Sequence, residues 1–181
     1  MGIERSFRAK TVYHEWALLL TRLVIGYGFM VHGWAKLSHG PANFEKLLVQ
    51  IRAPLPHLTS WIVPFVELLG GLAILLGAFV TITAIPLSAI MLVAIFTVHL
   101  KYGFSSIATI GLTPDGPVFG PPGYEVALLY IAGLVSLILG GAGVFSVDAL
   151  IHRSKPKATA PYGNPRTDRD IKHKQHNETA V

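Results

Sequence analysis

Four long apolar runs constrain this sequence more than any other feature. They cover about residues 16–35, 60–80, 82–100 and 124–143, and each is near the roughly 20 residues with which a helix crosses a ~30 Å hydrocarbon layer. Only 14% of the 181 residues are charged, against about 25% in soluble domains. We therefore predict an all-α, integral membrane four-helix bundle at residues 16–150, preceded by an N-terminal arm at residues 1–15.

The basic residues predict the orientation, because Lys and Arg next to membrane spans tend to stay in the cytoplasm. The arm contains Arg5, Arg8 and Lys10, and seven more basic residues follow from Arg153 onward. The two longer loops between spans contain four, namely Lys36, Lys46, Arg52 and Lys101. We expect a multi-pass protein of the cell's inner membrane with both termini cytoplasmic, which an even number of spans allows.

The segments between the spans have distinct compositions. The stretch "NFEKLLVQI" places Phe44, Leu47, Leu48 and Ile51 on one helical face and is too short to span, so we predict a short interfacial helix on the outer surface. Residues 101–123 are rich in Gly and Pro and form either a cap over the outer face or a flexible loop. Residues 151–181 lack apolar side chains to bury and are predicted to be a disordered tail.

Composition also limits the chemistry. The chain has no cysteine, which excludes disulfides, thiolate metal sites and thiol redox chemistry. Any electron transfer must then use a bound cofactor or another protein. The net charge of +5 does not indicate nucleic acid, because about half of the basic residues lie in the tail. Membrane lipid is the expected partner of this charge. The oligomeric state is not defined by the sequence.

Polar residues gather in one leaflet. At ~1.5 Å per helical residue, His32 and Lys36 lie at the outer end of the first span, and Glu67 lies one to two turns inside the second. The third span reaches the same level at His99, where Tyr124 and Glu125 begin the fourth. Charges in hydrocarbon require partners or a cavity. We predict an outward-facing polar pocket, although residues near span ends also mark the membrane interface in many proteins.

Arg22 is the exception in depth, about two turns from the inner end of the first span. Two arrangements are open: its side chain extends inward to the membrane surface, or it forms a buried pair with Glu67. Trp16, Trp34 and Trp61 lie near the predicted boundaries and are interpreted as interfacial anchors.

The motifs "LTRLVIGYGFMVHGWAKL", "PFVELLGGLAILLG", "IMLVAIFTVHLKYGF" and "GYEVALLYIAGLVSLIL" together resemble the DoxX-like family of small four-helix membrane proteins. That family is named after a subunit of a thiosulfate:quinone oxidoreductase, and other members resemble components of redox or oxidative-stress complexes. The resemblance places the family's polar positions at the following residues: Arg22, His32, Lys36, Glu67, His99, Tyr124 and Glu125.

The function that this resemblance implies is a membrane subunit of a redox system that transfers electrons to quinone from a small donor such as thiosulfate or from a redox partner protein. Glu67, His99 and His32 are the predicted catalytic residues, since reduction of a quinone takes up protons. The predicted substrate-binding residues are Arg22, Lys36, Tyr124 and Glu125, with Lys36 and Arg22 holding the anionic donor. We predict no metal site.

Two other functions are open. His32 and His99, from two helices at matched depth, are candidate axial ligands of a haem, although two histidines alone make haem a minor alternative. The second is a non-enzymatic module for binding, transport or assembly, in which the polar pocket holds a solute or only stabilises the bundle.

Overall fold

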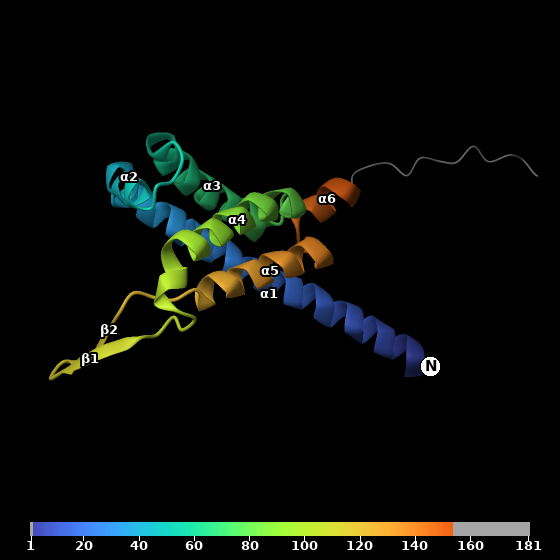
Figure 1. Ribbon diagram of the computed structural model, residues 1–181. Coiled ribbons are helices and arrows are strands. Elements are labelled where there is room, and N and C mark those ends of the chain that lie inside the picture. Colours follow the sequence, from blue (N-terminus) through green and yellow to red (C-terminus); the bar gives the residue numbers. More distant parts are fainter. Residues whose placement is uncertain (1, 154–181) are drawn as a thin grey trace, which may run out of the picture.

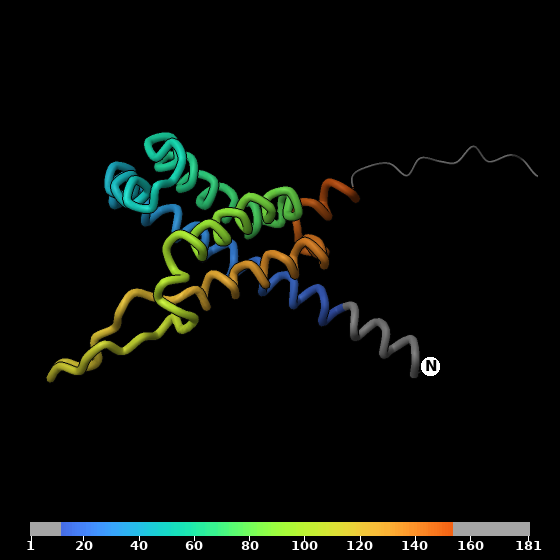
Figure 2. The backbone as a smooth tube through the Cα atoms, in the orientation of Figure 1, coloured from blue at the N-terminus to red at the C-terminus, as the bar shows by residue number. Residues whose placement is uncertain are grey.

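The computed structural model describes residues 2–153, with side chains from residue 12 onward, and is largely helical (Figures 1 and 2). The helices are α1 (Gly2–Ser38), α2 (Pro41–Gln50), α3 (Pro56–Leu76), α4 (Val80–Ala94), α5 (Glu125–Gly140) and α6 (Val147–Arg153). A π-helical turn, η1 (Ile95–His99), and a 3₁₀ turn, η2 (Leu100–Tyr102), continue α4. Strands β1 (Thr109–Thr113) and β2 (Gly116–Phe119) form an antiparallel hairpin.

Four helices form the bundle. α1 packs against α3 and α5, and α4 packs against the same two helices, so that each has two neighbours. Phe29, Ile74, Leu87 and Leu134, one from each helix, are fully buried between them. Figure 1 shows α2 and the hairpin at one end of this bundle, here called the hairpin end, and α6 at the other, here called the α6 end. The predicted four-helix membrane bundle is thus confirmed.

Close glycine contacts join α1 to α3. A Cβ atom at Gly26 would lie 2.7 Å from the carbonyl oxygen of Gly71, and one at Gly33 would lie 2.6 Å from the backbone nitrogen of Leu68. Gly70 instead faces the Leu87 side chain of α4. Small residues let membrane helices approach at this distance. The two adjacent glycines of α3, Gly70 and Gly71, therefore allow close packing against α4 on one side and α1 on the other.

Three helical segments are long and apolar enough to cross a membrane, namely Val12–Ser38, Pro56–Leu76 and Val80–Tyr102. Helix α5 is also apolar but has only 16 residues, about 24 Å at ~1.5 Å per residue. The predicted fourth span ended at residue 143, whereas the helix stops at Gly140 because Gly141 and Gly143 adopt positive φ angles. Many large apolar side chains point outward, such as Leu139, which is 82% exposed, as expected of a lipid-facing surface.

Some predicted boundaries need correction. The segment at residues 101–123 is neither a simple cap nor a shapeless loop, because it contains the β1–β2 hairpin. Helix α1 begins at Gly2, so residues 2–15, predicted as an N-terminal arm, are helical and continuous with the first span. The predicted interfacial helix is α2, with Leu48 buried. Of the predicted tail at residues 151–181, only residues 151–153 are described, as the end of α6; the remainder lies outside the described residues.

Candidate functional site

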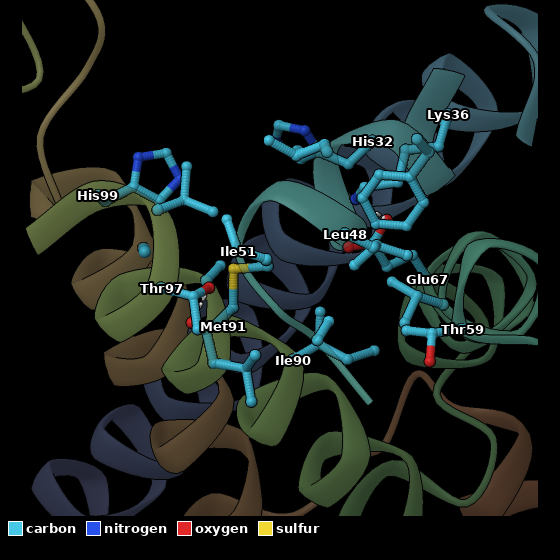
Figure 3. Close-up of a pocket in the computed structure, with 18 of the residues that line it drawn as sticks. His32, Lys36, Leu48, Ile51, Thr59, Glu67, Ile90, Met91, Thr97 and His99 are labelled. Carbon is cyan, nitrogen blue, oxygen red and sulfur yellow. Dashed lines mark hydrogen bonds and ion pairs between the residues drawn. The ribbon is translucent and has the colours of Figure 1, made fainter. Parts of the chain in front are cut away.

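A cavity of about 730 Å³ opens at the hairpin end of the bundle. Helices α1, α2, α3, α4 and α5 all contribute to its wall, together with η1 and the segment just before α5. Most lining side chains are apolar, including Leu48, Ile51, Ile90 and Met91. The chemistry therefore depends on a few polar groups, and the close-up in Figure 3 shows Lys36 and Glu67 on one side of the cavity with His99 on the other.

Lys36 and Glu67 form an ion pair between α1 and α3. Lys36 Nζ donates to Glu67 Oε2 and lies 5.5 Å from the ring centroid of Phe44 in α2. The Lys36 side chain is 26% exposed, whereas the Glu67 side chain is completely buried. The second carboxylate oxygen, Glu67 Oε1, is buried and accepts no hydrogen bond in the described part of the chain. A buried acceptor without a donor is rare and costly.

His99 ends the π-helical turn that continues α4. Such turns interrupt regular α-helix and occur frequently at functional sites. His99 Nδ1 lies 3.0 Å from the carbonyl oxygen of Pro122. Because a carbonyl oxygen can only accept, Nδ1 carries the proton, and Nε2 of the neutral ring is left as an acceptor. The histidine is thereby oriented by the segment that leads into α5.

Tyr130 of α5 also lines the cavity, and the sequence analysis missed it. Its ring makes edge contacts with Phe29 and His32, at centroid distances of 5.1 and 5.8 Å. A Cβ atom at Gly28 would overlap the Tyr130 hydroxyl, so the glycine provides the space for this group. A tyrosine in the middle of an apolar span, five residues after Glu125, is the signal that was available.

Two threonines at the wall are already satisfied locally. Thr97 Oγ1 donates to the carbonyl oxygen of Val93 at 2.7 Å, and Thr59 Oγ1 donates to that of Pro54 at 2.9 Å. The polar groups of the cavity that are left to meet a ligand are those of His32, Lys36, Glu67, His99 and Tyr130. Within the described range, no three His, Asp or Glu side chains are grouped so that they could hold a metal ion.

Tyr124 and Glu125 do not line the cavity. Glu125 Oε2 accepts hydrogen bonds from the backbone nitrogen of Ser106 at 3.0 Å and from its hydroxyl at 2.7 Å. Tyr124 packs edge-on against Phe104 at 5.5 Å. Both residues thus contact the segment that leads into the hairpin and not the cavity.

Arg22 adopts neither of the two predicted arrangements. Only 2% of the residue is exposed, and its guanidinium group donates to the carbonyl oxygens of Ile74 at 3.2 Å, Leu75 at 3.0 Å and Ala142 at 2.5 Å. It thus joins the end of α3 to the segment after α5. Lys36 lies fourteen positions later in α1, about 21 Å away along the helix. The structure does not bring Arg22 and Lys36 together to hold one anion.

These features define a class: a small helical membrane protein with a mostly apolar pocket, and a few polar groups in it, at one end of its bundle. The DoxX family model matches residues 17–100, the part that contains Arg22, His32, Lys36, Glu67 and His99. This part of the chain is similar to the DoxX family, in agreement with the resemblance found in its motifs.

The similar protein found has no described activity. A protein of Haemophilus influenzae, described as uncharacterized, is 27% identical over 138 residues, which cover 75% of this chain and 91% of that protein. No solved structure matches the chain.

Proposed function

We propose that the pocket binds the ring of a lipid-soluble quinone and that the protein is a membrane subunit of a quinone-linked redox system. The observation that carries this proposal is an apolar cavity of about 730 Å³ with the Lys36–Glu67 pair on one side and His99 on the other (Figure 3). A quinone has the matching form, a flat apolar ring with oxygen atoms on opposite sides. The volume lies within the ~300–1,000 Å³ range of small-molecule pockets.

Quinone reduction takes up two electrons and two protons and yields one quinol. Lys36 provides N–H donors on one side of the pocket, and His99 in its protonated form provides an Nε2–H on the other. Glu67 and His99 are the groups that exchange protons with the ring oxygens, because both are pocket-lining acids or bases. His32 and Tyr130 border the same space.

The electrons must come from outside this chain, which has no cysteine. We propose a reduced redox protein as the donor. The small-molecule alternative is thiosulfate, two ions of which release two electrons when a sulfur–sulfur bond forms between them. Lys36 is the only Lys or Arg that lines the described cavity, and its charge is matched by Glu67. The pocket is therefore better suited to a neutral ring than to an anion.

The test is binding and turnover in lipid nanodiscs. Short-chain benzoquinone should bind saturably to the wild-type protein, and His99→Phe should weaken binding, whereas Leu139→Ala on the lipid-facing side of α5 should not. Reduction of the bound ring is then followed with thiosulfate and with membranes that contain the native redox proteins. Absence of any saturable ring binding would overturn the proposal and favour a non-enzymatic binding or assembly module.

A further inference from the structure

Two of the residues that line the pocket, Glu67 and His99, have hydrogen-bond acceptors, and such acceptors distinguish a quinol, which carries hydroxyl donors, from a quinone, which carries none. We propose that the pocket prefers a ring that carries hydroxyl donors, so that the quinol binds more tightly than the quinone. This inference rests on the proposed function and deepens it by naming the redox form that the site favours. It follows from two residues with acceptor atoms that line the cavity from different elements, Glu67 in α3 and His99 in η1.

Glu67 gives the stronger support for a preference for the quinol. Its side chain is completely buried, and Oε2 accepts from Lys36, whereas Oε1 has no donor among the described residues. When it is ionised in its pair with Lys36, the carboxylate can only accept hydrogen bonds. Since the residue lines the cavity, a ligand in the cavity is the available source of the missing donor. A ligand hydroxyl supplies one, and a quinone carbonyl does not.

His99 adds a second acceptor across the cavity. Its Nδ1–H is occupied by the Pro122 carbonyl, so Nε2 of the neutral ring accepts and cannot donate. Ile51 and Met91 lie between the two polar sides in Figure 3, where they would contact the face of a ring. Two acceptors separated by apolar side chains match a ring with hydroxyl groups on opposite sides.

The hydrogen-bond donors of the pocket depend less on a ligand than Glu67 Oε1 does. Lys36 is partly exposed, so its remaining N–H groups can bond water. The Tyr130 hydroxyl donates or accepts equally well and does not discriminate between the two redox forms. Glu67 Oε1 is shielded from water by the protein, so its missing hydrogen bond is the one that a ligand completes with the greatest gain.

Three matched ligands test the inference in nanodiscs: a decyl benzoquinol kept reduced under argon, the corresponding benzoquinone, and the bis-methyl ether of the quinol. The quinol should bind at least about tenfold more tightly than the quinone, because sites built to hydrogen-bond a hydroxyl reject analogues without it. A tenfold preference also raises the midpoint potential of the bound couple by about 30 mV. The ether, which has the same ring without donors, should bind no better than the quinone.

Substitutions test which residues cause the preference for the quinol. Glu67→Gln and His99→Phe should each move the quinol-to-quinone affinity ratio toward one, and His99→Phe serves if Glu67→Gln does not fold. Glu45→Gln is the matched control, since this carboxylate of α2 pairs with His57 outside the cavity and should leave the ratio unchanged. Quinone binding as tight as quinol binding would overturn the inference alone. If none of the three rings binds, the proposed function fails with it.

Discussion

The two ends of the bundle use polar side chains in different ways. At the α6 end, Arg22 donates to three backbone carbonyls, and Asp148 accepts from the backbone nitrogens of Phe79 and Val80, at 2.8 and 3.3 Å. At the hairpin end, Lys36 and Glu67 bond each other beside a cavity, and one carboxylate oxygen is left without a donor. The first arrangement satisfies backbone groups near the ends of helices. The second leaves a carboxylate oxygen that can still accept a hydrogen bond from a ligand.

This comparison shows that a charged residue in a membrane helix is not by itself evidence of a functional site. Arg22 and Lys36 belong to the same helix and were both predicted to bind substrate. Their partners separate them, because backbone carbonyls at helix ends need donors whether or not a ligand is present. Substitutions at each end of the bundle separate the two roles.

Arg22→Met should have the largest effect on folding. It removes the guanidinium donors from the carbonyl oxygens of Leu75 and Ala142, whereas the Ile74 carbonyl keeps the backbone nitrogen of Gly77 as a donor at 3.1 Å. At about 1–3 kcal/mol for each buried oxygen left unpaired, we expect a loss of about 3 kcal/mol of stability. Thermal unfolding in detergent would measure it, with Val24→Met on the exposed side of α1 as the control. Ring binding per folded molecule should be unchanged. Unaltered stability would show that Arg22 is not the structural member of the pair.

Lys36→Met should cost less stability, about 2 kcal/mol, because a buried carboxylate without its cation takes up a proton and becomes neutral, which limits the penalty for the lost donor. It should also abolish ring binding. Adding Glu67→Leu should recover the stability, since an apolar pair often replaces a buried ion pair without loss, but binding should stay absent. Lys46→Met, on the exposed side of α2, is the control. Recovery of binding in the double variant would contradict a ligand role for the pair.

Gly28→Ala should have a moderate effect that is concentrated on the ligand. The added methyl group overlaps the Tyr130 hydroxyl, so the aromatic side chain of Tyr130 must shift at a cost of about 1 kcal/mol. Titration of the nanodisc protein should show weaker ring binding, whereas Gly111→Ala, which meets open space, should not. Combining Gly28→Ala with Tyr130→Phe should restore part of the stability, since a ring carbon would still lie 2.7 Å from the added methyl group, but it should not restore affinity. Full affinity in Gly28→Ala would remove Tyr130 from the site.

Much of the pocket was predictable because helical rise is constant. Counting residues along the four apolar runs was enough to place His32, Lys36, Glu67 and His99 at one level, and the structure brings them to one cavity. Depth alone does not give direction around the helix axis. This is why Glu125, at the same level, was predicted to bind substrate although it faces the hairpin base.

Other features depend on tertiary contacts or on signals that were overlooked. The bonds of Arg22 depend on where α3 ends and how the chain returns after α5, and neither is a local property. The π-helical turn that presents His99 has no pattern in the sequence. The hairpin did have one, since Asp115–Gly116 between residues of high β propensity is a turn signal, but a Gly- and Pro-rich loop was the prediction.

Glu125→Gln should have the smallest effect and tests the boundary of the site. An amide oxygen still accepts from Ser106, and the backbone bonds of Gly103 with Tyr124 and of Ser105 with Gly123 remain. We expect a stability change below about 0.5 kcal/mol and faster amide hydrogen exchange confined to residues 103–123. Ring affinity should match that of Glu45→Gln. Because the sequence alone predicted that Glu125 binds substrate, a loss of affinity as large as that of His99→Phe would return it to the site and would make the hairpin base part of the pocket.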